Sequence, residues 1–301
     1  MQTATHAAMQ TTLRAAVTLA GSGAHGGRPA RVTVSPAGVD TGVVFCVAGV
    51  EISAHWSQVD GAHLRTRLAS NGASVSTVEH LMAALAGLGV DNVIVDVDGD
   101  EIPAMDGSAA CFVSAIDEVG VVAQPAARGV WRVAAPVRIS DGAGWAELRP
   151  AQSGLSLDVE IAFAGAIGRQ RLALDLTGDS FRRELARART FGFLQDAERL
   201  WAAGLALGAS LDNTLVMDGE TLLNPFGLRF ADEFVRHKML DVVGDLALAG
   251  APIVGAFRSY RGGHGLNLAL LRAAAERGAL VWSGETAPRA GVASVATTRS
   301  P

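Results

Sequence analysis

The run Asp232-Glu-Phe-Val-Arg-His-Lys-Met-Leu-Asp-Val-Val-Gly-Asp245 places His237, Asp241 and Asp245 at intervals of four residues. Its apolar residues recur with helical periodicity and predict a helix over residues 231–249. Side chains at i and i+4 lie on one helix face, with Cβ atoms about 5–6 Å apart. An imidazole and a carboxylate at this spacing can both reach one ion, because zinc–ligand bonds are about 2.0–2.2 Å long. His237 and Asp241 are therefore candidate metal ligands, and Asp245 is placed to orient a group beside the metal.

The same face has a simpler interpretation, a solvated polar stripe in which an i,i+4 pair stabilises the helix by about 0.2–0.5 kcal/mol. Aspartate is a poor helix former, so two of them in mid-helix need an explanation. Metal ligation supplies one and is the interpretation that we favour.

Gly250 ends this helix, and a strand is predicted at residues 253–257. A helix at 76–88, Gly89 and a strand at 92–97 repeat the same order in the first half of the chain, which hints at two related folds. Pro125 lies between them, so we expect domains at 1–126 and 127–285, and a disordered tail at 286–301.

The sequence also predicts other elements. Other strands are predicted at 31–35, 43–50, 131–139, 145–149 and 155–163. Other helices are predicted at 107–119, 180–188, 195–203 and 266–277, and a two-residue hairpin turn at Asp218-Gly219.

The composition excludes several classes of protein. The chain has 301 residues, and its formal net charge of -5 argues against a general nucleic-acid binder. No run reaches the roughly 18 apolar residues of a membrane span. Cys46 and Cys111 lack metal-ligand spacing; a disulfide is possible, but buried thiols in a reducing compartment are favoured. We expect a cytoplasmic monomer that acts on a small molecule.

Three histidines outside the opening run are candidates for the same site. Glu79 and His80 form a histidine–carboxylate pair, although Ser76-Thr-Val-Glu79 also matches a helix capping box. His264 and His25 lie in glycine-rich loops, where an imidazole can approach a ligand closely, or can be an ordinary surface residue. No Gly-x-Ser-x-Gly elbow, P-loop lysine or His-Glu-x-x-His helix is present.

Taken together, these segments closely resemble the UDP-3-O-acyl-N-acetylglucosamine deacetylases, zinc amidases of lipid A synthesis in Gram-negative bacteria. The resemblance covers the chain up to about residue 275. Besides the opening run, it depends on Thr77-Val-Glu-His80, Asp91-Asn92, Glu101-Ile-Pro-Ala-Met-Asp-Gly-Ser108, Ala188-Arg-Thr-Phe-Gly-Phe193 and Gly263-His-Gly-Leu-Asn267.

The resemblance implies an α+β fold of two similar domains, each a sheet packed on helices, with the active site between them. It also implies one Zn²⁺ per chain, bound by His80, His237 and Asp241. Glu79 would be the general base. His264 would stabilise the oxyanion and protonate the leaving amine, oriented by Asp245.

The family's substrate contacts match Thr190, Phe191, Lys238, His25 and Arg261 in this sequence. Two positions depart from the family pattern: Arg261 stands where many members have lysine, and residues 163–168 lack a His-Pro pair. Two other functional classes remain open, a zinc amidase for a different sugar nucleotide and a catalytically silent sugar-nucleotide-binding protein.

Overall fold

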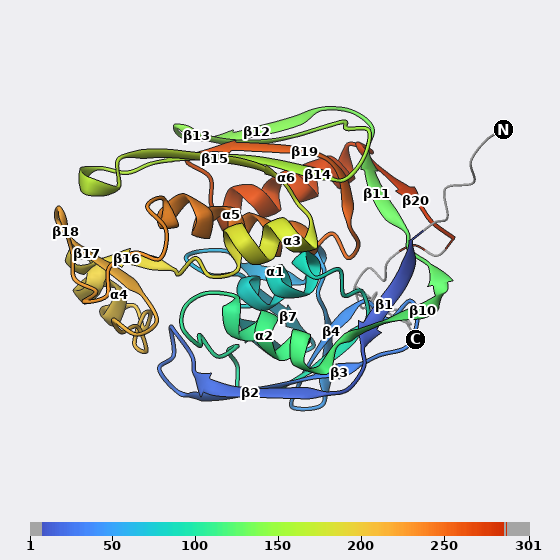
Figure 1. Ribbon diagram of the computed structural model, residues 1–301, viewed down its shortest axis with the longest axis horizontal. Helices are drawn as coiled ribbons and strands as arrows, with labels where there is room; N and C mark the ends of the chain where they lie inside the picture. Colours follow the sequence, from blue (N-terminus) through green and yellow to red (C-terminus); the bar gives the residue numbers. More distant parts are fainter. Residues whose placement is uncertain (1–7, 286, 288–301) are drawn as a thin grey trace, which may run out of the picture.

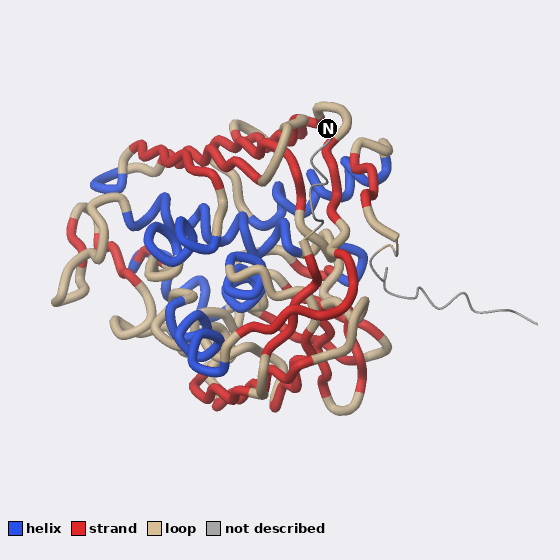
Figure 2. Tube along the Cα trace, turned by 45° about the vertical axis from the view of Figure 1, so that its right-hand side comes forward, coloured by secondary structure: helices blue, strands red, loops and turns tan. Residues whose placement is uncertain are grey.

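Two β-sheets form the outer layers of the protein, and helices fill the space between them (Figure 1). The computed structural model describes residues 8–285 and residue 287. Figure 2 shows the same layers from a second direction, with strands above and below the central helices. Each sheet therefore buries one face against helices, as an α+β fold requires.

The first half of the chain builds one outer sheet, in the strand order β2-β3-β9-β4-β5. Its members are β2 (Val17–Ser22), β3 (Pro29–Pro36), β9 (Val93–Asp98), β4 (Val43–Val47) and β5 (Val50–Ser53). Helices α1 (Glu79–Gly87) and α2 (Ala110–Val119) belong to this half. So does a small sheet of β6 (Val59–Gly61), β7 (Arg67–Ser70) and β8 (Ala73–Ser76). The half is completed by the 3-10 turn Trp56–Gln58 and by the strand pair β1 (Met9–Leu13) and β10 (Val121–Ala127).

The second half builds the other outer sheet, which has seven strands. They are β12 (Val137–Asp141), β13 (Gly144–Arg149), β19 (Ile253–Tyr260), β11 (Val130–Val133), β20 (Leu280–Ser283), β14 (Leu155–Ala162) and β15 (Arg169–Asp175). Helices α5 (Glu233–Ala247) and α6 (His264–Glu276) pack on it, and a small sheet of β16 (Phe191–Phe193), β17 (Leu215–Asp218) and β18 (Thr221–Leu222) with α4 (Ala197–Ala202) lies at one edge (Figure 1).

The two halves repeat one plan, and the predicted α+β fold of two similar domains is confirmed. In each half a buried helix ends near a glycine with positive φ, Gly89 or Gly250, and leads into a strand inside the sheet. We propose that the boundary lies near residue 127, between β10, which pairs with β1, and β11, which joins the second sheet. The tail predicted at 286–301 lies, except for residue 287, outside the described residues.

Several predicted elements are wrong in detail. The strand expected at 43–50 is a hairpin, because Ala48 and Gly49 both have positive φ and turn the chain. The strand expected at 131–139 is two strands, interrupted before Pro136, which has no N–H for a ladder. The turn of the predicted hairpin is Gly219-Glu220, one residue later than expected.

Two predicted helices are regular α-helices over only part of their length. Residues 180–188 contain only the short α3 (Gly178–Ser180) and a π-helical turn at Phe181–Leu185. Residues 195–203 contain a 3-10 turn (Leu194–Asp196) and α4, and a further 3-10 turn (Gly165–Ile167) joins β14 to β15. The helical turns at 194–202 lie within one residue of the expected bounds, whereas those at 178–185 begin two residues and end three residues earlier than expected.

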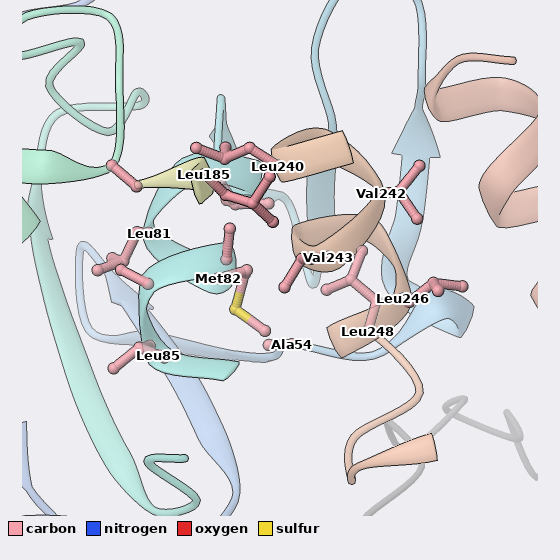
Figure 3. Packing of buried hydrophobic residues seen from close by; sticks show 14 of the residues in the cluster. Ala54, Leu81, Met82, Leu85, Leu185, Leu240, Val242, Val243, Leu246 and Leu248 are labelled. Carbon is pink, nitrogen blue, oxygen red and sulfur yellow. The ribbon is translucent and has the colours of Figure 1, made fainter. Parts of the chain in front are cut away.

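Helices α1 and α5 pack against each other at the centre of the protein. Figure 3 shows Met82 of α1 beside Val243 and Leu246 of α5. These side chains are at most 2% exposed, so the contact between the two halves is made by buried apolar residues. Gly244 lies where the helices approach most closely, because a Cβ there would overlap the carbonyl oxygen of Glu79.

We expect Gly244→Ala to destabilise the protein by about 1–3 kcal/mol, the usual cost of overpacking a filled core. The new methyl group meets backbone, which cannot rotate away, and it pushes on Glu79. Urea denaturation measures the loss. Gly265→Ala is the matched control: a Cβ at Gly265 meets nothing within 4 Å, so we expect unchanged or slightly increased stability. Equal stability of the two variants would show that the helices can move apart.

Candidate active site

Three helices bring six of the candidate residues together. Glu79 and His80 are the first two residues of α1, and His264 is the first of α6. His237, Asp241 and Asp245 lie on α5, on the polar face that the sequence predicted. All six side chains are buried although all six are polar or charged. Buried polar and charged side chains need hydrogen-bond partners, ion-pair partners or a bound ion. The contacts of each of the six show which of these it has.

His80, His237 and Asp241 form a group whose ligand atoms all lie within 4.8 Å of one another. Asp241 Oδ1 is 3.6 Å from His80 Nε2 and 3.4 Å from His237 Nε2. Two ligands of a tetrahedral zinc ion, with bonds of about 2.0–2.2 Å, are themselves about 3.3–3.6 Å apart. The two distances from Asp241 Oδ1 therefore match those between ligands of one ion, and the three donors together could hold one.

Asp241 shows which of its oxygens faces such an ion. Oδ2 accepts a hydrogen bond from Lys238 Nζ at 2.7 Å, whereas Oδ1 is buried and has no hydrogen-bond partner among the described residues. His237 Nδ1 donates to the carbonyl oxygen of Ala188 at 3.1 Å, which leaves Nε2 free to ligate. Burial lowers the pKa of His237 to about 4, and the neutral form is the one that binds metals.

Glu79 lies beside this group and does not form the capping box. Val78 precedes α1, and no side chain in the described part of the chain caps the helix there. Instead, Glu79 Oε2 accepts a hydrogen bond from the backbone N–H of Thr66 at 3.0 Å, and Oε1 lies 3.9 Å from His264 Nε2. Burial raises the pKa of Glu79, and the nearby histidines only partly oppose this. A carboxylate with a raised pKa is suited to accept a proton.

His264 is held by Asp245. Its Nδ1 donates to Asp245 Oδ2 at 2.8 Å, and its Nε2 is 3.9 Å from Asp241 Oδ2, so the second ring nitrogen faces the group of three donors. Burial alone would lower the pKa of His264, but Asp245 and Asp241 outweigh it and raise the pKa to about 9. An imidazolium with one N–H facing the site can donate a hydrogen bond or a proton there.

Phe191 lies next to the same group, on a separately anchored segment that also carries Thr190. Their neighbour Arg189 forms a buried ion pair with Glu233, with Nε 2.8 Å from Oε1 and Nη2 3.0 Å from Oε2. Burial opposes the charged form of Glu233, yet Arg189 holds its pKa below the usual value. The ring of Phe191 is 6.2 Å from that of His237. The start of α5 thus fixes the segment that borders His80, His237 and Asp241, the candidate metal-ligand group.

Phe191 is also the centre of an aromatic cluster with Phe163, Phe193 and Phe234. Ring centroids are 5.4 Å apart for Phe163 and Phe191, and 5.1 Å for Phe191 and Phe234. Phe163 is 36% exposed and Phe234 is buried, so the cluster extends from the surface towards His237. Phe163 belongs to the segment in which the sequence departs from the family pattern.

The remaining predicted substrate residues lie outside the six-residue group. His25 Nδ1 accepts a weak hydrogen bond from the backbone N–H of Ala206 at 3.3 Å, which joins a turn of the first half to a loop of the second. Burial and then the charge of Arg65 lower the pKa of His25 to about 4. Arg261 is exposed in the loop before α6, and Lys238 is turned towards Asp241.

Two residues in contact with the site were missed from the sequence, Thr66 and Asn267. Asn267 Nδ2 donates to Asp245 Oδ2 at 2.8 Å, and Thr66 Oγ1 donates to Asp245 Oδ1 at 2.7 Å. Asn267 lies three residues after His264 on the same helix, a spacing that could have suggested it. Thr66, between two arginines, carries no signal in the sequence.

A family model described as UDP-3-O-acyl N-acetylglycosamine deacetylase matches residues 10–276. The chain belongs to this family. Its relatives include the UDP-3-O-acyl-N-acetylglucosamine deacetylases of Brucella ovis, Brucella canis and Brucella melitensis biotype 2. Each is 52% identical over 272 residues, a match that covers 88% of this chain and 95% of the relative. The family that the sequence resembles is confirmed.

All six residues of the buried group lie within the part of the chain that matches the deacetylase family. Cys46 and Cys111 are free cysteines, as expected, but they are half-buried and not fully buried. Among the described residues, no helix has both the length and the apolar character needed to cross a membrane.

Proposed function

We propose that this protein hydrolyses the N-acetyl amide of UDP-3-O-acyl-N-acetylglucosamine and releases acetate, as a zinc-dependent step of lipid A biosynthesis. The observation that carries the proposal is the convergence of His80, His237 and Asp241 beside Glu79 and His264, in a chain of the deacetylase family. We further propose that the protein acts in the cytoplasm as a monomer.

One zinc ion per chain would be held by His80, His237 and Asp241. Two nitrogen donors and one carboxylate oxygen are a common catalytic set for zinc, and the unpartnered Asp241 Oδ1 fits a cation. When bound, zinc would lower the pKa of a coordinated water to about 7 and polarise the amide carbonyl. Lys238 neutralises the other oxygen of Asp241 and so favours a single ligand geometry.

Glu79 is our proposed general base. It would take a proton from the attacking water as the water oxygen bonds to the acetyl carbon. Its Oε2 is fixed by the Thr66 N–H, which leaves Oε1 on the side of His264 to receive that proton. Burial raises the pKa of Glu79, and a raised pKa makes a carboxylate a stronger base towards the water proton.

His264 is our proposed general acid. As the carbonyl oxygen gains negative charge, the Nε2–H of imidazolium and the Thr190 hydroxyl would stabilise it. The carbon–nitrogen bond then breaks, and His264 gives its proton to the departing amine of the sugar. Asp245 accepts a hydrogen bond from Nδ1 and keeps the imidazolium charged and correctly turned.

The substrate carries a diphosphate and an acyl chain, and separate residues would bind them. We assign the acyl chain to the aromatic cluster around Phe191, because it joins the surface to the metal-ligand group. His25, Lys238 and Arg261 are proposed contacts of the polar part of the substrate. Arg261 is exposed and cationic, as a contact to the diphosphate requires.

We expect His264→Ala to lower kcat by about 10²–10³-fold, the typical effect of removing one preorganised oxyanion donor, while KM changes little. The reason is that His264 acts on charge that develops only in the transition state. Steady-state kinetics on zinc-loaded protein measure both constants. A raised KM with normal kcat would instead assign His264 to substrate binding.

Acetate release tests the whole proposal and separates it from the two other classes. The protein is assayed with the acylated and the non-acylated UDP-N-acetylglucosamine, each with and without a chelator. We expect release from the acylated substrate, and loss of release with the chelator. Preference for the non-acylated sugar would indicate a different amidase, and no release from either would indicate a binding protein.

A further inference from the structure

Thr66 lies at the point where the first half of the chain meets both proton-transfer groups. It directly precedes β7, and the β7–β8 hairpin returns the chain to the start of α1. Its carbonyl oxygen therefore accepts a hydrogen bond from the Val78 N–H at 3.4 Å, and its own N–H donates to Glu79 Oε2 at 3.0 Å. The backbone of Thr66 thus fixes one oxygen of Glu79.

The side chain of Thr66 reaches across to the second half of the chain. Its Oγ1 is 2.7 Å from Asp245 Oδ1, so the hydroxyl donates to a carboxylate that is completely buried. The other oxygen, Oδ2, accepts hydrogen bonds from His264 Nδ1 and Asn267 Nδ2, both at 2.8 Å. Thr66 is itself completely buried.

We propose that Thr66 is a positioning residue that sets the orientation of both Glu79 and His264. Its N–H aims Glu79, and its hydroxyl fixes the carboxylate plane of Asp245, which in turn holds the imidazole of His264. This inference rests on the proposed function, since it takes Glu79 and His264 to be the groups that move protons. Within the described part of the chain, the hydrogen bonds that Thr66 makes to side chains go to these two partners, Glu79 and Asp245, and through them it acts on the site.

The geometry explains why the hydroxyl matters. Asp245 Oδ1 has a short contact with Thr66 and a longer one, 3.1 Å, with His264 Nδ1. Without the hydroxyl, the carboxylate can rotate to bring Oδ1 towards His264, and the imidazole turns with it. Small misplacements of a catalytic group lower the rate strongly, whereas substrate binding far from that group is unaffected.

Thr66→Val and Thr66→Ser form a matched pair that tests the hydroxyl. Valine keeps the shape and the backbone N–H but removes the donor to Asp245; serine keeps the donor and removes a methyl group. We expect Thr66→Val to lower kcat by about 10–100-fold, the usual worth of a hydrogen bond to a charged group, with KM within about twofold. Thr66→Ser should retain kcat within about threefold. Equal loss in both variants, or full kcat in Thr66→Val, overturns the proposal.

A double-mutant cycle with Asp245→Ala shows whether Thr66 acts through Asp245. We expect Thr66→Val to have no further effect on single-turnover rate in the Asp245→Ala background. Additive effects of the two substitutions would overturn the proposal, because Thr66 would then act by another route.

An NMR measurement tests the same proposal without relying on turnover, so a variant that is partly unfolded is not mistaken for one with a misplaced catalytic group. NMR of ¹⁵N-histidine-labelled, metal-free protein follows the Nδ1 proton of His264. We expect one sharp downfield signal in wild type and Thr66→Ser, and a shifted or broadened one in Thr66→Val. Identical signals in all three proteins overturn the positioning role. If wild type releases no acetate while the signals differ as expected, the proposed function fails and the positioning of His264 by Thr66 stands.

Discussion

Replacing Glu79 with glutamine should leave one zinc ion bound per chain and lower kcat by about 10²–10⁴-fold, the range for loss of a general base. Glutamine has the same shape and can still accept the hydrogen bond from the Thr66 N–H, so the start of α1 should keep its structure. The glutamine side chain cannot accept a proton from water, so the substitution removes the general base and little else. Metal analysis and steady-state acetate release on the same preparation measure the two effects.

Glu276 provides the control for this experiment. It is exposed at the end of α6, and Glu276→Gln should change neither zinc content nor kcat. A Glu79→Gln variant with full activity would remove Glu79 from the mechanism. Loss of zinc together with activity would assign Glu79 to metal binding instead.

Replacing Asp241 with alanine should reduce zinc affinity by more than about 100-fold and abolish turnover. Outer residues that merely hold ligands are typically worth about 10–100-fold in metal affinity, so a direct ligand should be worth more. Asp241 also neutralises Lys238, and the variant leaves that ammonium group without its carboxylate partner. Equilibrium dialysis against zinc measures the affinity.

Lys238→Met is the matched control for Asp241→Ala, because it removes the neighbouring charge and leaves all three donors in place. We expect it to retain one zinc ion per chain. Zinc binding by Asp241→Ala that equals wild type would exclude direct ligation by this carboxylate.

The parts of the fold that sequence predicted best have strong periodicity and clear ends. The helix expected at 231–249 is α5 at Glu233–Ala247, because its apolar stripe is long and Gly250 follows. The hairpin at Ala48-Gly49 was missed because alanine is not a typical turn residue. The propensities of single residues also do not show that the segments on either side, β4 and β5, pair with each other.

The site was predictable only in part for a similar reason. His237, Asp241 and Asp245 lie on one helix, so their spacing placed them on one face. Glu79 matched a capping box as well as a catalytic role, and only the folded chain, with Val78 before α1 and Glu79 bonded to the Thr66 N–H, excludes the capping box. Thr66 itself lies 179 positions before Asp245, and no local pattern links two residues so far apart.

Zinc K-edge X-ray absorption of the zinc-loaded protein tests the central claim most directly, namely that His80, His237 and Asp241 hold one ion. We expect nitrogen and oxygen neighbours at about 2.0–2.2 Å, with the multiple-scattering signature of two imidazoles. A sulfur neighbour at about 2.3 Å, or fewer than two imidazoles, would contradict it.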